Sequence, residues 1–185
     1  PYINMNNQRR TGVDLSVNVG KKHGDFEWNV GLVGMYYTSK NTKWDENVKY
    51  DWLKAEGEAI DALRGYQCIG FFKDAADVES SAKVNANTKP GDLKYVDQNN
   101  DGVINEQDQV VLGKWGASWV MGLNLTAKYK GFTLFVAGTG SFGGKGLKNN
   151  SYMHVYGDRK YSEVVRGRWT EETADIATYP RLTTQ

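Results

Sequence analysis

The sequence predicts an all-β chain, a segment of a transmembrane antiparallel β-barrel with about four strands in two hairpins and long extracellular loops. Two observations carry this prediction. Over the clearest segments apolar side chains alternate with polar ones, a period of two that is typical of β-strands and not of helices. The connections between these segments are alternately very short and very long, which is how strands are joined in outer-membrane barrels.

The first hairpin is predicted over residues 12–39. In its first strand the stretch GVDLSVNVG places on one face Val13, Leu15, Val17 and Val19, and on the other Asp14, Ser16 and Asn18. A polar turn at residues 20–25 leads into a second alternating run. That run places on one face Phe26, Trp28, Val30, Leu32 and Tyr36, opposite Glu27, Asn29 and Gly31.

The second hairpin is predicted over residues 118–142, with Lys130 and Gly131 as its turn. Its first strand alternates between two sets, one of which is Trp119, Met121, Leu123, Leu125, Ala127 and Tyr129. The polar or small members of the other set are Gly122, Asn124, Thr126 and Lys128. The return strand shows one apolar face with Phe132, Leu134 and Val136, so the two strands are expected to pair.

The long segments 40–117 and 143–185 are predicted to be extracellular loops of one barrel that takes in the whole of residues 1–185. Short helices are compatible with residues 51–65 and with residues around 161–165. Aromatic residues near both ends of the strands are expected to form girdles at the two membrane interfaces. The turn-end girdle would comprise Phe26, Trp28, Tyr129 and Phe132, and the outer girdle Tyr36, Tyr37 and Trp119.

Composition excludes several other classes. The formal charge of +1 without a clustered basic surplus gives no footprint for nucleic acid. The single cysteine, Cys68, rules out an intrachain disulfide framework and is expected to be a small buried side chain. His23 and His154 have no partners at the spacing of a catalytic or zinc site. No apolar run approaches the roughly 18 residues of a transmembrane helix.

A soluble β-sandwich shows the same alternation, so periodicity alone leaves both folds open. The barrel is favoured because the second face of the strands carries small or polar residues, as a wet lumen requires, and because loop lengths alternate. The soluble alternative is a calcium-stabilised β-domain that binds carbohydrate through aromatic residues of its loops. A third hypothesis is a hydrolase with paired acids at Glu171 and Glu172 or at Asp74 and Asp77, but adjacent loop acids are usually solvated.

The stretch DQNNDGVINEQD within the first long loop has the spacing of a calcium-binding loop. Calcium takes six to eight hard oxygen ligands, and a glycine at the sixth position permits the sharp turn. The predicted ligands are Asp97, Asn99, Asp101, the Val103 carbonyl, Asn105 and Asp108, with Gly102 at the turn. The last ligand is an aspartate in place of the usual glutamate, and the flanks look extended. An asparagine- and aspartate-rich surface turn is the alternative. We expect a structural calcium ion that fastens the long loop, with Ile104 packing onto a local core.

Five stretches together resemble a known family: RRTGVDLSVNV (9–19), GYQCIGFFKD (65–74), KPGDLKYVDQNNDGVINEQDQVVLG (89–113), LNLTAKYKGFTLFVAGTGSFG (123–143) and RGRWTEETADIATYPRLT (166–183). The chain resembles a late part of the SusC/RagA group of TonB-linked outer-membrane receptors of Bacteroidetes. The family's N-terminal plug, TonB box and carboxypeptidase-like extension have no counterpart here, and closing strands are expected beyond YPRLTTQ.

This resemblance implies import of an oligosaccharide or a peptide across the outer membrane of a Gram-negative bacterium. Energy would come through TonB, a SusD-like surface lipoprotein would cover the barrel, and outer-membrane lipid would surround it. The resemblance also implies no enzymatic activity. It supports a metal at Asp97, Asn99, Asp101 and Asp108, because members of the family commonly share this loop. It carries over no substrate-binding residue.

Overall fold

The computed structural model describes residues 4–154 and 161–183, and β-strands dominate them. The order of elements is β1 (Asn7–His23), β2 (Phe26–Lys43), the 3-10 turn η1 (Asp51–Leu53), β3 (Ala62–Tyr66), β4 (Cys68–Phe71), α1 (Ala75–Ser80), β5 (Leu93–Tyr95), η2 (Glu106–Asp108), β6 (Gln109–Lys114), β7 (Trp119–Tyr129), β8 (Phe132–Phe142) and η3 (Glu163–Gly167). Among the described residues, no helix is long and apolar enough to cross a membrane.

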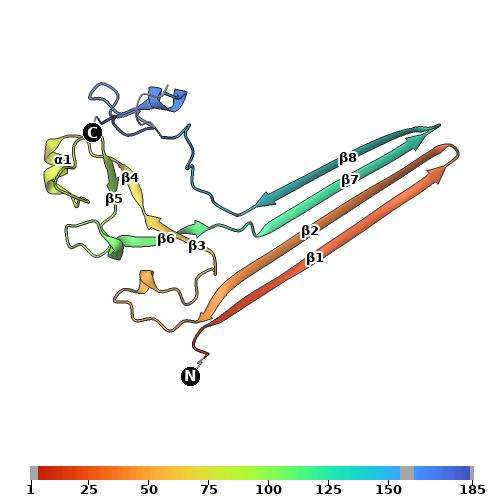
Figure 1. Ribbon diagram of the computed structural model, residues 1–185, viewed down its shortest axis with the longest axis horizontal. Helices are drawn as coiled ribbons and strands as arrows, with labels where there is room; N and C mark the ends of the chain where they lie inside the picture. The colour runs from red at the N-terminus through yellow and green to blue at the C-terminus, as the bar shows by residue number, and fades with distance from the viewer. Residues whose placement is uncertain (1–3, 155–160, 184–185) are drawn as a thin grey trace. The chain divides into compact units, whose positions relative to one another are not determined.

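The chain divides into two units. The strand unit comprises the residues up to Leu63 together with Gly113–Lys145, and the loop unit comprises Arg64–Leu112 and the residues from Gly146 onward. In the strand unit, β1, β2, β7 and β8 form one antiparallel sheet in that order (Figure 1). This sheet is the pair of predicted hairpins, joined side by side through β2 and β7.

Both hairpin turns are tight. In the second, Lys130 and Gly131 have φ angles of 43° and 86°, the left-handed pair that suits the twist of two neighbouring strands. In the first, Gly24 has a φ of 58°. The strands of the first hairpin run further than predicted, over Asn7–His23 and Phe26–Lys43 in place of residues 12–39. The extra residues are polar, so hydrophobic alternation did not reveal them.

The strand register confirms the predicted two-faced pattern. Val19 lies opposite Val30, Val30 opposite Leu125, and Leu125 opposite Val136, so apolar side chains from all four strands share one face. The other face carries mostly small and polar residues: Asp14, Ser16, Asn18, Glu27, Asn29, Gly31, Gly122, Asn124, Thr126, Lys128, Thr133 and Ser141.

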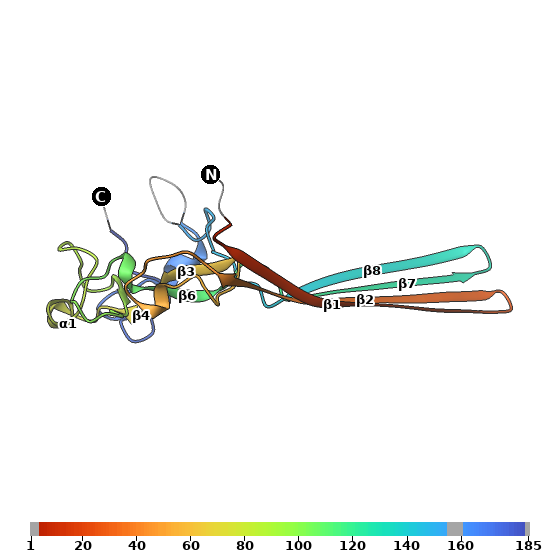
Figure 2. The same ribbon diagram turned by 90° about the horizontal axis from the view of Figure 1, so that it is seen from below.

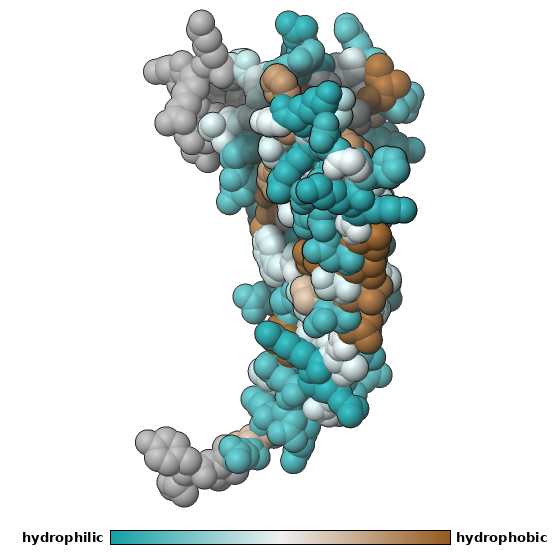
Figure 3. All heavy atoms as spheres, turned by 90° about the vertical axis from the view of Figure 1, so that its right-hand side faces the viewer, coloured by the Kyte–Doolittle hydropathy of each residue, from teal (hydrophilic) through white to brown (hydrophobic). Residues whose placement is uncertain are grey.

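The apolar face is not covered by any described element. Val13 is 72% exposed, Leu15 68%, Leu123 45% and Phe132 80%. Figure 2 shows the four strands nearly edge-on as a single layer, and Figure 3 shows apolar side chains gathered in a band at the surface. A soluble sandwich would bury these side chains beneath an opposing sheet, because exposed apolar area costs free energy in water. The described part of the chain therefore has the face of a sheet that contacts lipid.

The loop unit, in contrast, has a small core of its own. Phe72 is 1% exposed, Ile104 4%, Val165 5% and Val78 9%. Ile104 thus packs into a local core, as the sequence predicted. Two short sheets, β3 with β6 and β4 with β5, organise the first long loop.

Two minor predictions were wrong. Residues 51–65 form no α-helix: η1 ends at Leu53 and β3 begins at Ala62. Gly57 lies between them with a φ of 88°, and the backbone of Asn41 binds both Gly57 and Glu58, which ties this segment to the end of β2. Cys68 is exposed at the start of β4 and is not a buried side chain.

Candidate functional site: a two-faced sheet, its rim and its loops

Two rows of aromatic side chains bound the apolar face. Register aligns Phe26, Tyr129 and Phe132 near the hairpin turns, and Tyr36, Trp119 and Phe142 at the opposite end. The rings of Tyr36 and Trp119 lie 4.5 Å apart, centroid to centroid. Of the predicted girdle residues, Trp28 lies one step inside the first row, and Tyr37 belongs to the opposite face. Phe142 was not predicted, because the glycine-rich end of its strand obscured the alternation.

The spacing of these rows matches a membrane. Ten residues separate Phe26 from Tyr36 along β2, which corresponds to roughly 33 Å of strand. A tilt of about 45° reduces this to a height of about 23 Å, close to the apolar band of about 25 Å in outer-membrane barrels. The two rows therefore lie where the two interfaces of the hydrocarbon layer would be.

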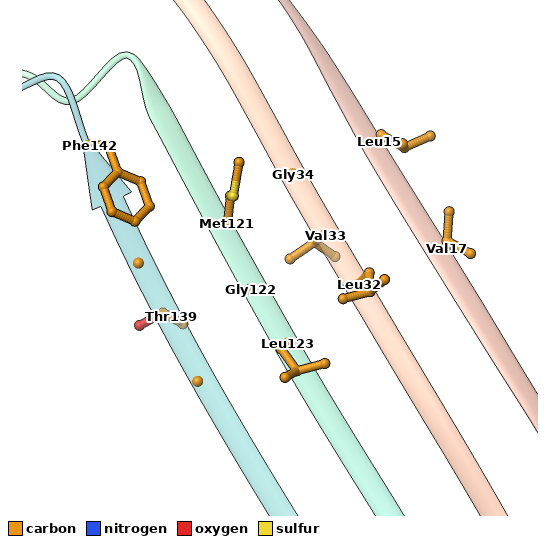
Figure 4. Close-up of a pocket in the computed structure, with 12 residues that line it drawn as sticks. Leu15, Val17, Leu32, Val33, Gly34, Met121, Gly122, Leu123, Thr139 and Phe142 are labelled. Atoms are coloured by element: carbon orange, nitrogen blue, oxygen red, sulfur yellow. The ribbon is translucent and has the colours of Figure 1, made fainter.

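A shallow depression interrupts the apolar face near the outer row (Figure 4). It has a volume of about 570 Å³. Gly34, Gly138 and Gly140 contribute no side chains there, and the surrounding side chains are Leu15, Val17, Leu32, Met121, Leu123 and Phe142. Val33, Gly122 and Thr139, which belong to the other face by register, also line it.

The polar face carries amide and charged side chains that contact neighbouring strands. Asn124 lies directly over Gly31, so closely that a Cβ on Gly31 would be 2.5 Å from the Asn124 Oδ1 atom. Lys128 Nζ lies 3.5 Å from Glu27 Oε1 near the hairpin turns. Hydroxyl, amide and charged groups of this kind are expected on the lumen side of a barrel strand.

At the outer end of the polar face, Asp61 binds both the end of β2 and the segment just before β7. Its Oδ2 atom accepts a hydrogen bond of 2.5 Å from the backbone N–H of Gly116, and Ser39 Oγ donates to its Oδ1 atom over 3.4 Å. Its backbone carbonyl accepts from the N–H of Trp115 at 3.0 Å. These bonds position a pocket of about 490 Å³ beside Tyr37, which we call the rim pocket.

The predicted calcium loop is a network of side chains bonded to its own backbone. Asp97 accepts from the N–H groups of Asp101 and Gly102, at 3.3 and 2.8 Å. Asp101 accepts from the Val103 N–H at 2.9 Å and from the Asn99 amide nitrogen at 2.8 Å. Gly102 has the expected positive φ, 82°.

Asp108 closes this loop from inside. It is 0% exposed, and its two oxygens accept the backbone N–H groups of Gln98 at 2.9 Å and Asn105 at 2.8 Å. Asn105 caps η2 by accepting from the Gln107 N–H. Within residues 4–154 and 161–183, no three acidic, histidine or cysteine side chains are grouped closely enough to hold a metal ion. The three carboxylates among the predicted ligands, Asp97, Asp101 and Asp108, therefore share one loop without forming such a group.

The C-terminal part of the loop unit is joined to β5 by a charged pair. Arg181 donates from Nε and Nη2 to the two carboxylate oxygens of Asp92, over 2.7 and 3.2 Å. Beside them, Gly91 has a φ of 85° and leaves room for the Trp169 ring, which a Cβ would approach to 2.4 Å. No sequence pattern predicts this pair, whose members are 89 residues apart.

The acids proposed for a hydrolase have structural partners. Lys94 Nζ lies 2.6 Å from Asp77 Oδ1, and this hydrogen bond is the main reason that the pKa of Asp77 lies below its ordinary value. Asp74 caps α1 by accepting from the Asp77 N–H at 2.8 Å. Glu171 and Glu172 are exposed. Among the aromatic residues of the loops, Trp52 stacks on Tyr50 at 4.5 Å, which is packing within the loop.

No protein-family model matches the chain. Two curated relatives from Formosa agariphila do: TonB-dependent receptor P26 is 30% identical over 125 residues, which are 65% of this chain and 12% of the relative. TonB-dependent receptor P3 is 29% identical over 90 residues, 49% of this chain and 9% of the relative. The solved structure of the RagAB peptide transporter superposes with a TM-score of 0.63 at 15% identity, covering 96% of this chain and 20% of the other.

A single-layer antiparallel sheet, apolar on one face, polar on the other and bounded by aromatic rows, defines a segment of a transmembrane β-barrel. The RagAB superposition supports that fold. The two sequence relatives are TonB-dependent receptors, so the chain is similar in sequence to a segment of such a receptor and similar in fold to part of the RagAB transporter. The chain spans only a small part of the length of these relatives.

Proposed function

We propose that the chain forms part of the barrel wall of a receptor in the outer membrane of a Gram-negative bacterium, which imports a bulky nutrient with energy supplied through TonB. The observation that carries the proposal is the sheet with one exposed apolar face between two aromatic rows. Lipid would cover that face, and the polar face would line the water-filled path of the nutrient. The related receptors and the RagAB transporter support the same activity.

The partner that we propose is a SusD-like surface lipoprotein, which would cover the extracellular mouth formed by residues 40–117 and 143–185. The cargo would be an oligosaccharide or a peptide. Support comes from the loop unit, because its own core and its Asp92–Arg181 ion pair give it a defined structure that a partner can bind. The receptor would move its cargo without chemical change, as the transport role of the related proteins suggests. The loop acids Asp74 and Asp77 serve a helix cap and an ion pair.

The test is growth of the source bacterium after deletion of the gene for the full-length receptor. A panel of single polysaccharides and a protein hydrolysate would serve, each as sole carbon source. We expect loss of growth on at least one source and recovery when the gene is restored. Uptake of that source, once labelled, should stop when a protonophore collapses the energy supply. Unchanged growth on every source, or uptake that ignores the protonophore, would contradict the proposal.

We also propose that the loop from Asp97 to Asp108 binds a structural calcium ion. The ligands would be the side chains of Asp97, Asn99, Asp101, Asn105 and Asp108 and the carbonyl of Val103. The left-handed Gly102 and the alternating oxygen-bearing side chains support this. Each oxygen of Asp108 accepts one N–H and keeps a second lone pair for a cation. Calcium would displace the hydrogen bond that the Asn99 amide donates to Asp101, so binding of the ion and formation of this hydrogen bond compete.

Limited proteolysis of the full-length receptor tests this second proposal. We expect cleavage within residues 97–108 to be slower with calcium than with a chelator, because bound calcium opposes opening of the loop. The double substitution Asp97→Asn and Asp101→Asn should remove that difference. The matched control, Glu171→Gln with Asp175→Asn, removes two exposed charges elsewhere in the loop unit and should preserve it. Equal cleavage with and without calcium in the unsubstituted receptor would contradict calcium binding.

A further inference from the structure

The rim pocket lies on the polar face of the sheet and extends from the level of the outer aromatic row past the end of that row. It is lined by Arg10, Met35, Tyr37, Ser39, Ile60 and Asp61, all from the strand unit. Arg10 is paired with Ser39, which follows Tyr36 of the outer row by three residues. Three residues of strand correspond to roughly 10 Å. In the proposed barrel, the pocket would therefore lie just above the hydrocarbon layer, where cargo enters the lumen.

Arg10 and Asp61 line this pocket with opposite charges, but among the described residues they form no ion pair with each other. The two oxygens of Asp61 accept hydrogen bonds from the Gly116 N–H and the Ser39 hydroxyl. Arg10 is exposed, and in the described part of the chain its guanidinium makes no hydrogen bond or ion pair. Lys114 adds a second cation, with Nζ 5.4 Å from the centre of the Tyr37 ring. Among the described residues, the rim pocket thus has a guanidinium without a hydrogen-bonding partner.

We propose that the rim pocket is a subsite for a carboxylate group of the cargo, with Arg10 as the residue that pairs with it; this rests on the proposed import function. A guanidinium presents parallel N–H donors that match the two oxygens of a carboxylate, which makes such pairs strong and directional. Met35 and Ile60 supply apolar wall beside the cation, which reduces competition from water.

A carboxylate can come from the C-terminus of a peptide or from a uronic acid in an oligosaccharide, and the experiment separates these sources. Binding to the purified full-length receptor would be measured by calorimetry with four probes. The first two are N-acetyl-tetraalanine with a free carboxylate and the same peptide as its amide. The other two are trigalacturonic acid and neutral maltotriose. We expect at least one acidic probe to bind more tightly than its neutral counterpart.

Substitution then assigns the binding to Arg10. Because a charge-assisted bidentate pair is lost, Arg10→Gln should weaken binding of the acidic probe about ten- to a hundred-fold and leave its neutral counterpart unchanged. Arg10→Lys keeps the charge without the paired donors and should restore part of the affinity. The control is Arg9→Gln, because Arg9 is the next residue of β1 and lies on the opposite face. It should bind like the unsubstituted receptor.

The subsite is refuted if neither acidic probe binds the unsubstituted receptor, or if Arg10→Gln and Arg9→Gln behave alike while both keep the thermal transition of the parent. The acidic probe that binds names the source of the carboxylate. Failure of import is a separate result, because it appears as unchanged growth after gene deletion. If only the subsite proposal is wrong, deletion of the gene still abolishes growth on at least one source, but acidic probes bind no more tightly than neutral ones.

Discussion

The assignment of the two faces makes a sharp prediction about charge placed on adjacent residues of β1. Val19 lies on the apolar face opposite Val30, and Asn18 lies on the polar face opposite Gly31. Between the positions that pair with the two aromatic rows, His23 and Val13, Val19 is four residues from one and six from the other. At about 3.3 Å a residue and a tilt of about 45°, this is roughly 9 and 14 Å in depth. Val19 therefore faces lipid close to the middle of the membrane.

An arginine there must be taken out of water. Val19→Arg should destabilise the folded receptor by about 2–4 kcal/mol, the usual cost of a lipid-facing arginine at the midplane. Asn18→Arg, at nearly the same depth, should cost at most about 1 kcal/mol, because its side chain remains in the water-filled lumen. Both variants add the same large side chain, so that effect is common to them. The difference of at least about 1 kcal/mol between their destabilisations therefore reports the medium that surrounds each side chain.

The measurement is guanidinium unfolding of the full-length receptor reconstituted in phosphatidylcholine vesicles. Heat-modified migration on gels would report the folded fraction. Val19→Arg should shift the transition to lower denaturant concentration and Asn18→Arg should leave it nearly unchanged. Equal shifts for the two variants would mean that both faces contact the same medium. That result would refute the barrel interpretation of this sheet, whatever the sequence relatives are.

Three further predictions concern individual contacts. Gly12→Ala should lower the thermal transition, because a Cβ there would be 2.5 Å from a backbone oxygen of β2, whereas Gly34→Ala meets nothing within 4 Å and should be neutral. Asp108→Ala leaves two backbone N–H groups without their acceptor and should cost about 2 kcal/mol or more. We expect this loss of stability to appear as faster amide hydrogen exchange confined to the loop, and unchanged exchange would contradict the prediction. The lowered pKa of Asp77 stabilises the loop unit above the ordinary carboxyl value, near 3.9, and that stabilisation is lost as pH falls through the lower folded value. Lys94→Met should therefore flatten the acid dependence of proteolysis in this unit, and an unaltered pH profile would count against the pair.

The sheet was predictable because its signal is local. Alternation along each strand places Leu15 or Leu123 on a face without knowledge of any neighbour, and the turn at Lys130 and Gly131 fixes which strands pair. Polar strand ends carry no such signal, so the extension of β2 to Lys43 was missed. The pairing of β2 with β7 joins residues about a hundred positions apart and could be inferred only from the idea of a barrel.

The loops were predictable only in part, because their structure depends on distant partners. The spacing of the calcium motif and the left-handed Gly102 follow from local chemistry, and the structure has that glycine as expected. The burial of Asp108 and its two backbone bonds were not foreseen, since a spacing pattern does not say which carboxylate turns inward. Arg10 lies in the stretch RRTGVDLSVNV, but nothing in that stretch marked it as a binding residue. Its position on the polar face became meaningful once the register was known.

The two units depend on different surroundings for their stability. The loop unit buries Phe72 and Ile104 and holds itself together with hydrogen bonds and ion pairs, so it resembles a small soluble core. The strand unit leaves Val13 and Leu15 largely exposed, and its outer strands β1 and β8 each present an edge with no partner among the described residues. Unpaired edges cannot remain open in a hydrocarbon layer, because the backbone groups there have no water to bind. The sheet must therefore be completed by further strands before lipid can stabilise it. Substitutions at the edges of β1 or β8 should affect assembly of the whole barrel, whereas substitutions around Phe72 should act within the loop unit.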